Sequence, residues 1–334
     1  MTKLNVAVLM GGTSSERDIS LSTGKQILGA LDPAKYRVFA LDTQTRETYL
    51  PPPSAAIEQM VSVDGSTQIA ALPQLPQAAD RDRPDVVIVA LHGKGGEDGT
   101  IQGFLDIVGI PYTGSGVLAS ALAMDKSRSK TFLAAHGVRF PKGVAIRRHD
   151  PRPADFPLPA VVKPSLSGSS DGLTIVPVGG DLNAALDTAF ALDETVLIEE
   201  FVKGMEITCA VLGNDTLEVL PLVEIVPANG VYDREAKYTP GATDEICPAR
   251  LSDDLTAKAQ KIAQVCHAAL GCRGMSRTDM IVTASGEIYA LEVNTIPGMT
   301  PTSLLPKAAA TAGYSFPQLL DKLVGYALEG AAIG

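Results

Sequence analysis

Two carboxylates and a carboxamide share one face of a predicted β-hairpin in RTDMIVTASGEIYALEVN, residues 277–294. Apolar runs flank a Ser-Gly pair, and glycine permits the positive φ that a tight two-residue turn requires. With such a turn Asp279 faces Glu292, and Arg277 faces Asn294. Side chains alternate along a strand, so all four lie on one face. Opposed side chains are roughly 5 Å apart, so the two acids repel each other.

Two interpretations of this face are open. It is either a solvated sheet face on which Arg277 pairs with the acids, or a site for a hard divalent cation. Oxygen ligands suit Mg²⁺, which proteins hold with one or two carboxylates plus substrate phosphates. The apolar flanks and the shortage of neighbouring cations favour the metal site.

The segment KPSLSGSSDG, residues 163–172, lies between two apolar runs and holds two glycines and four serines. Backbone N–H groups in such a loop can cradle phosphate oxygens, and Lys163 adds a point charge. A flexible hairpin tip is the alternative. The chain contains no GxxxxGK[ST], so this is not a Walker A loop.

Four further segments have weaker signals. Residues 114–119 fit GxGxxA, but no acid follows about 20 residues later at a strand end, so a glycine-fixed helix start is favoured over a dinucleotide site. The acidic and apolar stretch 198–206 suits either an adenine and ribose site or an ordinary strand exit. Glu16 begins a helix after a glycine turn, where it either favours the helix dipole or reaches a ligand. His92 follows a strand end, where open α/β sheets bind ligands.

Composition limits the function classes. The chain has 334 residues, 45% apolar and 20% charged, with a net charge of −10. Nucleic acid as a partner is disfavoured because phosphate binding needs clustered Lys and Arg. No apolar stretch reaches the roughly 18 residues of a membrane span, and the start lacks a signal-peptide pattern. The four cysteines form no CxxC pair and are expected to be buried thiols. We expect a cytoplasmic globular protein.

The elements that must position these residues form an α/β protein. Strands at 4–10, 37–41 and 85–91 with a helix at 15–31 predict an N-terminal parallel sheet, and 43–80 reads as a long connection. One helix is expected at 115–136. A strand hairpin then surrounds the Gly/Ser loop, and helices are expected at 182–191, at 253–270 and after Phe316. We predict three domains, at 1–114, 115–202 and 203–334.

The chain resembles the D-alanine–D-alanine ligases, a family of ATP-grasp enzymes. Eight motifs in the family order carry the resemblance nearly end to end: VLMGGTSSERDIS, ALHGKGGEDGTIQG, IPYTGSGVLASALAMDKSRSK, VVKPSLSGSSDG, VLIEEFVKGMEIT, YDREAKY, SRTDMI and LEVNTIPGMTPTSL. The resemblance implies an ATP-grasp fold in which two α+β domains enclose ATP. It also implies a homodimer that joins two D-alanine molecules through an acyl phosphate, for peptidoglycan synthesis.

The resemblance also implies roles for individual residues. Lys126 and Lys163 would bind the phosphates of ATP. The adenine would be bound by Glu199, Phe201 and Val202, and the ribose by Glu206. Two Mg²⁺ ions, with Mn²⁺ as a substitute, fall to Asp279, Glu292 and Asn294. The catalytic set is Glu16, Ser169, Tyr238, Arg277 and Gly298. The substrate-binding set is His92, Lys237 and Ser303.

Two alternatives stay open. One is an ATP-grasp ligase that joins D-alanine to another amino or hydroxy acid. The other is a nucleotide-binding module without catalysis, for which the only hint is Asp171, because many relatives have an apolar residue there.

Overall fold

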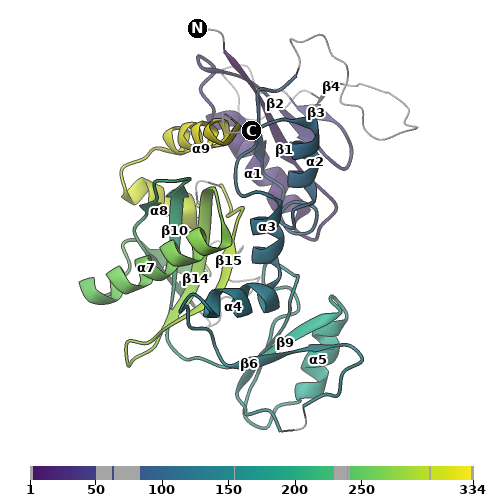
Figure 1. The fold of residues 1–334 in the computed structure, drawn as a ribbon, viewed down its shortest axis with the longest axis vertical. Coiled ribbons are helices and arrows are strands. Elements are labelled where there is room, and N and C mark those ends of the chain that lie inside the picture. The colour runs from purple at the N-terminus through teal and green to yellow at the C-terminus, as the bar shows by residue number, and fades with distance from the viewer. Residues whose placement is uncertain are drawn as a thin grey trace.

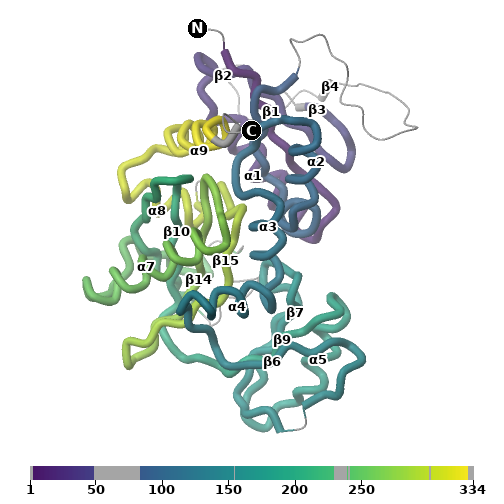
Figure 2. The backbone as a smooth tube through the Cα atoms, viewed as in Figure 1, coloured from purple at the N-terminus to yellow at the C-terminus, as the bar shows by residue number. Residues whose placement is uncertain are grey.

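Three β-sheets are arranged along the long axis of the part of the chain that the structure describes. The computed structural model describes residues 3–49, 62–63, 83–153, 155–228, 239, 241–300 and 302–331. Figures 1 and 2 show the N-terminal sheet at one end, a four-stranded sheet at the other, and a six-stranded sheet between them. No helix in these ranges is both long enough and apolar enough to cross a bilayer.

The N-terminal sheet has the order β4-β3-β2-β1-β5, and β1 pairs in parallel with both β2 and β5. This confirms the predicted parallel sheet, to which β3 and β4 add an antiparallel edge. The central strands are almost fully buried, as expected for a sheet covered on both faces. The elements are β1 (Leu4–Met10), α1 (Arg17–Ala30), β2 (Tyr36–Asp42), β3 (Thr48–Tyr49), β4 (Ser62–Val63), β5 (Val86–Val89) and α2 (Thr100–Val108).

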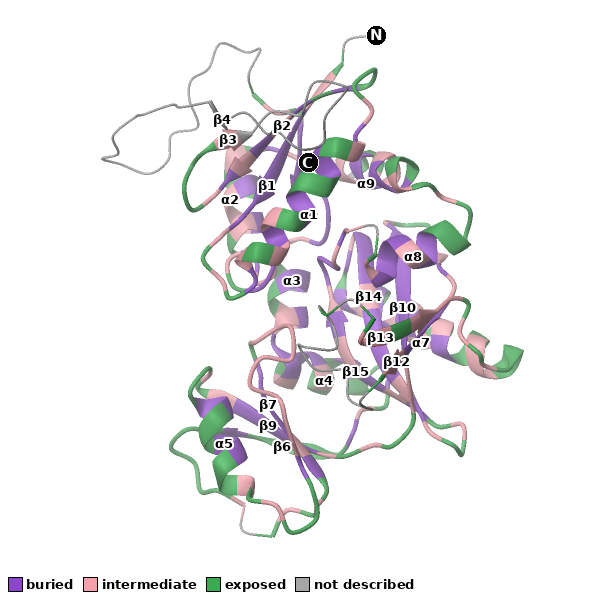
Figure 3. Cartoon of the chain, turned by 180° about the vertical axis from the view of Figure 1, so that it is seen from behind, coloured by how far each residue is buried: buried purple, intermediate pink, exposed green. Residues whose placement is uncertain are grey.

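The four-stranded sheet is antiparallel, with the order β6-β9-β7-β8. The predicted hairpin around the Gly/Ser loop is confirmed, because β7 pairs antiparallel with β8. One helix, α5, packs Leu186 and Phe190 against Val162 and Ile198 of the sheet, and its outer face is exposed in Figure 3. The elements are β6 (Gly143–Arg147), β7 (Ala160–Pro164), β8 (Thr174–Val176), α5 (Leu182–Phe190) and β9 (Thr195–Glu200).

The six-stranded sheet has an apolar layer on each face. Ile207, Cys209 and Val211 pack with α7, whereas Ala210 and Leu212 join the core that contains α8 and α9. Alternate residues of one strand therefore face opposite layers. The elements are β10 (Met205–Gly213), β11 (Glu218–Val219), β12 (Val223–Pro227), β13 (Thr243–Ile246), α7 (Asp253–Leu270), β14 (Gly274–Val282), β15 (Ile288–Asn294), α8 (Leu304–Thr311) and α9 (Phe316–Ala331).

The single helix predicted over 115–136 is wrong, because the structure has two helices there. They are α3 (Val117–Met124) and α4 (Lys126–Ala134), separated by Asp125 in an extended conformation. The Asp125 carboxylate accepts a hydrogen bond from Arg128 N at 3.0 Å and so caps α4. Such N-caps satisfy backbone donors that a helix start leaves unpaired. Both helices contact the six-stranded sheet through its core. The domain limits at 115 and 203 stay a prediction.

The C-terminal helix α9 returns to the N-terminal sheet (Figure 1). Its buried residues Leu319, Leu320, Leu323 and Val324 share one hydrophobic core with β1, β2 and β5. On the rim of this contact, Asp321 accepts hydrogen bonds from Lys35 Nζ at 2.5 Å and from Tyr36 Oη at 2.8 Å. The first and last segments of the chain are therefore one packing unit.

Candidate active site

The carboxylate hairpin is formed by β14 and β15, and its register confirms the predicted pairs. Asp279 lies opposite Glu292, and Arg277 lies opposite Asn294. The predicted two-residue turn is wrong. Thr283 and Glu287 pair at the tip, which leaves three residues between them. A β-bulge between Asp279 and Met280 then shifts the register by one residue and restores the predicted pairing at the site.

The charges on this face are paired, contrary to the expected shortage of cations. Arg277 donates to Asp279 through Nε at 2.8 Å and Nη2 at 2.7 Å, and Lys126 Nζ lies 3.0 Å from Glu292 Oε2. The sequence pattern could not show Lys126, because it reaches the hairpin from α4. The face is not solvated either, because the Asp279 side chain is only 10% exposed. Buried and charge-paired carboxylates in a cavity wall are typical of a functional site.

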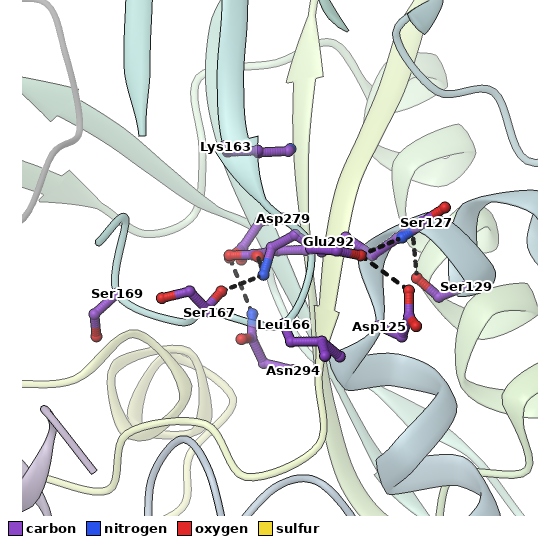
Figure 4. Close-up of polar contacts among 12 residues, drawn as sticks. Asp125, Ser127, Ser129, Lys163, Leu166, Ser167, Ser169, Asp279, Glu292 and Asn294 are labelled. Atoms are coloured by element: carbon purple, nitrogen blue, oxygen red, sulfur yellow. Dashed lines mark hydrogen bonds and ion pairs between the residues drawn. The ribbon is translucent and has the colours of Figure 1, made fainter. Parts of the chain in front are cut away.

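Two more side chains hold Asp279 in place. Thr208 Oγ1 of β10 donates to Asp279 Oδ1 at 2.6 Å, and Asn294 Nδ2 donates to Oδ2 at 3.1 Å. Figure 4 shows Asp279, Glu292 and Asn294 together, with Leu166 and Ser167 of the Gly/Ser loop beside them. The loop and the hairpin therefore meet at one site, as the phosphate and metal hypotheses together require.

Two hydrogen bonds with residues outside the Gly/Ser loop hold it in place, one at Ser167 and one at Ser169. Lys126 Nζ donates to Ser167 O at 2.6 Å, and the Ser169 hydroxyl donates to the Glu16 carboxylate. Ser169 and Ser170 have φ values of 51° and 60°, which non-glycine residues adopt at a cost of order 1–3 kcal/mol. The flexible-tip interpretation is thus not supported, because contacts from α1 and α4 hold this loop in a strained conformation.

A cavity of about 620 Å³ contains the substrate and catalytic residues that lie in the described ranges. It opens between the start of α1, the loop after β5, the hairpin and the start of α8. Gly93 and Gly168 leave room for the Glu16 carboxylate, since a Cβ on either would lie only 2.8 Å from Glu16 Oε2. The sequence-predicted residues on its wall are Glu16, His92, Ser169, Arg277, Glu292, Asn294, Gly298 and Ser303.

Glu97 also lines this cavity, although it was not among the residues predicted from the sequence. Its carboxylate accepts a hydrogen bond from Gly93 N at 2.8 Å. Burial, and next the nearby Glu16 carboxylate, raise the pKa of Glu97 to about 8. Burial likewise lowers the pKa of His92 to about 4, so its imidazole is neutral at pH 7. The available signal was the pair of acids in HGKGGEDG directly after a strand.

A second cavity, of about 490 Å³, lies between the four-stranded and six-stranded sheets. The Gly/Ser loop covers one side through Ser167, Ser170 and Asp171. All six residues predicted to bind the nucleotide line it: Lys126, Lys163, Glu199, Phe201, Val202 and Glu206. Asp279 and Glu292 line it as well, and Glu292 also lines the first cavity. One carboxylate is therefore a shared wall of the two cavities.

Comparison with known proteins decides the family. Residues 5–115 match the model for the D-ala D-ala ligase N-terminus, and residues 149–325 match the model for its C-terminus. The D-alanine–D-alanine ligase of Syntrophobacter fumaroxidans is 48% identical over 98% of each chain. The chain belongs to the D-alanine–D-alanine ligase family.

Solved structures of D-alanine ligases share this fold. The D-alanine–D-alanine ligase of Bacillus anthracis complexed with ATP is 33% identical, with a TM-score of 0.77 over 99% of both chains. The VanG D-Ala:D-Ser ligase of Enterococcus faecalis is also 33% identical, with a TM-score of 0.78 over 98% of this chain and 100% of the ligase. The ATP-grasp fold predicted from the sequence is thus confirmed.

Two site residues that the ligase resemblance implies, Lys237 and Tyr238, lie outside the described residues. The GxGxxA segment is a helix start, as favoured, because Gly116 directly precedes α3. Asp171 accepts a hydrogen bond from Ser15 Oγ at 2.8 Å. This acid of the Gly/Ser loop therefore interacts with the N-terminal unit.

The hairpin of this ligase has the ligand types that Mg²⁺ requires. Asp279, Glu292 and Asn294 present carboxylate and carboxamide oxygens beside the phosphate loop. Within the ranges that the structure describes, no group of three or more His, Cys, Asp or Glu side chains is arranged to hold a metal ion. Two carboxylates and an amide fit a site that substrate phosphates complete, which is how Mg²⁺ is commonly held.

Proposed function

We propose that the protein joins two D-alanine molecules, with cleavage of ATP to ADP and phosphate, into D-alanyl-D-alanine for peptidoglycan synthesis. The observation that carries this proposal is the shared wall. Glu292 lines both the cavity with the nucleotide residues and the cavity with the substrate residues. A phosphoryl group bound in one cavity can therefore meet a carboxylate bound in the other.

In the nucleotide cavity, Glu199, Phe201 and Val202 bind the adenine and Glu206 binds the ribose. Lys126 and Lys163 bind the phosphates as point charges. Asp279, Glu292 and Asn294 would hold two Mg²⁺ ions, or Mn²⁺ in their place, which would supply neutralisation of the phosphate charge. Phosphoryl transfer depends mainly on positioning and charge neutralisation, and these residues supply both. This set is supported by its common location on one cavity wall.

In the substrate cavity, Glu16 binds the ammonium group of the first D-alanine and is oriented by Ser169. The carboxylate of that D-alanine attacks the γ-phosphorus of ATP and forms an acyl phosphate, with ADP as the leaving group. The amine of the second D-alanine then attacks the acyl carbon, and phosphate leaves. Arg277 and the backbone N–H of Gly298 stabilise the oxyanion of that step, where one such donor is worth about 3–4 kcal/mol.

The remaining assignments are part of the same proposal. Ser303 and Lys237 bind the second substrate's carboxylate, Tyr238 completes the contact with Ser169, and His92 lines the first substrate's site. Neutral His92 hydrogen-bonds to Thr23 through Nε2 at 3.3 Å, which fits a positioning function. We also propose a cytoplasmic homodimer. Both statements rest on the family resemblance, and sedimentation analysis of the purified chain tests the dimer.

The acceptor is tested separately, because the chain is equally identical to a D-Ala:D-Ala and a D-Ala:D-Ser ligase structure. ATP-dependent phosphate release is measured with Mg²⁺ and D-alanine as the only amino acid, and the product is identified by its mass in a mass spectrometer. We expect phosphate and D-alanyl-D-alanine in equal amounts, and none with L-alanine. Release only after addition of D-serine or D-lactate would establish the other acceptor. ATP binding without release under any of these conditions would overturn a catalytic function.

A further inference from the structure

Glu199 is a deeply buried carboxylate held by two lysines. It lies on β9, and its side chain is 2% exposed. Lys163 of β7 approaches one oxygen, with Nζ 3.0 Å from Oε2. Lys130 of α4 pairs with the other oxygen, Oε1. Both lysines are nearly buried too, with exposed side-chain fractions of 9% and 12%.

The two lysines differ in their relation to the nucleotide cavity. Lys163 and Glu199 line it. Lys130 is not among the residues that line it, and its Nζ lies 5.4 Å from the centre of the Phe140 ring. Lys130 is therefore placed to contact Glu199 without contacting a nucleotide.

Two lysines share one carboxylate in this trio. The proposed function assigns Lys163 to a phosphate, which draws its charge toward the nucleotide. A buried carboxylate left without a partner is strongly disfavoured. Lys130 is the remaining cation of the trio and keeps Glu199 paired when Lys163 is drawn away.

The ionised form of Glu199 matters for base recognition. A carboxylate only accepts hydrogen bonds, whereas a protonated carboxyl group also donates. Adenine presents an amino group at position 6, and guanine presents a carbonyl oxygen there. An ionised Glu199 therefore accepts from adenine and repels guanine, and a protonated one loses this distinction.

We propose that Lys130 is a positioning residue that keeps Glu199 ionised in the nucleotide-bound enzyme and thereby sets the preference for ATP over GTP. This inference rests on the proposed function of Glu199 in binding adenine. Lys130 itself touches no substrate atom, so its effect appears in nucleotide affinity and selectivity rather than in the chemical step.

The charge of Lys163 affects whether Lys130 is a cation. With Lys163 beside Glu199, burial, and next the charge of Lys163, lower the pKa of Lys130 to about 6, while the Glu200 carboxylate raises it. Movement of Lys163 toward a phosphate removes one of the two lowering effects, so Lys130 takes up a proton as the nucleotide binds. Glu200 itself accepts a hydrogen bond from Lys142 N at 2.9 Å.

The test compares Lys130→Met with the conservative Lys130→Arg and with Lys261→Met, a lysine on the exposed face of α7. Phosphate release with D-alanine is measured over ranges of ATP and GTP. We expect Lys130→Met to raise the KM for ATP and to reduce the ATP-over-GTP ratio of kcat/KM by about 10–100-fold, the size of one hydrogen bond to a charged group. The KM for D-alanine stays unchanged. Lys130→Arg retains most of the preference, and Lys261→Met retains all of it.

A double-mutant cycle separates this role from a merely structural one. Glu199→Gln removes the charge that Lys130 pairs with, so Lys130→Met should change selectivity little in that background. Independent, additive effects would overturn the proposal, and so would an unchanged ATP-over-GTP ratio in Lys130→Met. If Lys130→Met does not fold, Glu199→Gln and Lys130→Arg decide by the same ratio.

The wild-type enzyme distinguishes failure of this inference from failure of the proposed function. Wild-type protein that neither binds nor cleaves ATP in the presence of D-alanine would contradict the proposed function. Wild-type protein that prefers ATP, with variants that keep the same preference, would contradict only the role of Lys130.

Discussion

Lys126 Nζ lies 3.0 Å from Glu292 Oε2 and 2.6 Å from Ser167 O, so one lysine joins the Gly/Ser loop to the carboxylate hairpin. The contact crosses from α4 to β15 and to the loop after β7. Glu292 also lines both cavities. We therefore expect a substitution of Glu292 to change the binding of both ATP and D-alanine.

Replacement of Glu292 by Gln is expected to abolish Mg²⁺-dependent turnover and leave the fold intact. The amide keeps the shape of the side chain but removes the negative charge that a divalent cation requires. We expect phosphate release to fall at least about hundredfold, because several kcal/mol of charge stabilisation depend on the metal. Glu287→Gln, in the exposed part of the same hairpin, is the control. Full activity in Glu292→Gln would rule out the metal assignment.

Replacement of Gly168 by Ala is expected to weaken binding of the first D-alanine. The added Cβ would lie 2.8 Å from Glu16 Oε2, so the carboxylate that we propose to bind the ammonium group of D-alanine must move. We expect the KM for D-alanine to rise about tenfold or more, since a hydrogen bond to a charged group is lost, while the KM for ATP changes little. Gly325→Ala in α9, where a Cβ meets nothing within 4 Å, is the matched control. An unchanged KM for D-alanine would mean that Glu16 does not bind it.

Replacement of Asp125 by Ala is expected to reduce both stability and ATP affinity. Asp125 caps α4 and also accepts a hydrogen bond from Ser165 Oγ at 2.9 Å. Loss of such a cap costs about 1–2 kcal/mol of unfolding free energy, and the end of α4 that carries Lys126 loses its support. Asp181→Ala removes the equivalent cap of α5, and we expect a similar loss of stability with no change in the KM for ATP. Equal effects of both variants on ATP binding would contradict this role of Asp125.

The Glu97 carboxyl group is expected to give the protein a measurable pH dependence. Its pKa is raised from 4.5 to about 8 by burial and by Glu16, with Glu292 acting in the same direction and Arg277 and Gly93 N–H acting against it. Between those pH values the folded state holds a proton that the unfolded state releases, so this group lowers stability as pH rises from about 4.5 to about 8.

Glu97→Gln should remove that contribution. The measurement is the free energy of unfolding in denaturant at pH 5 and pH 8 for both proteins. The difference between the two pH values should be more favourable to pH 8 in the variant than in the wild type. The exposed Glu194→Gln should behave as wild type. Identical pH dependence in Glu97→Gln and wild type would show that Glu97 is ionised across this range.

The site hairpin shows how far sequence reasoning reached. Alternation fixed the shared face of Asp279 and Glu292, because it depends only on the period of a strand. The turn was predicted one residue too short, and an unforeseen bulge at Leu291 compensated for it. Bulges occur near active sites, but no residue in the segment IYALEVN indicated one here. The correct pairing at the site therefore depended on two local errors of opposite sign.

Contacts between segments far apart in the chain could not be predicted from the sequence pattern either, for a different reason. Glu97 is close to Glu16, and Lys126 is close to Glu292, only because separate units pack together. Periodicity describes one element at a time. The break at Asp125 is a different case, because an Asp that follows the apolar helical stretch VLASALAM and precedes KSRSKTFLA is a capping signal that was present in the sequence.

The packing of α9 against the N-terminal sheet has a consequence for biosynthesis on the ribosome. The apolar surface beneath Leu319, Leu320 and Val324 belongs to a sheet whose strands are complete by Val89. The α9 helix that covers it begins at Phe316, over 200 residues later, which is roughly 10–45 s of translation at about 5–20 residues per second. During that interval the nascent chain exposes an uncovered hydrophobic sheet face, the kind of surface that chaperones bind.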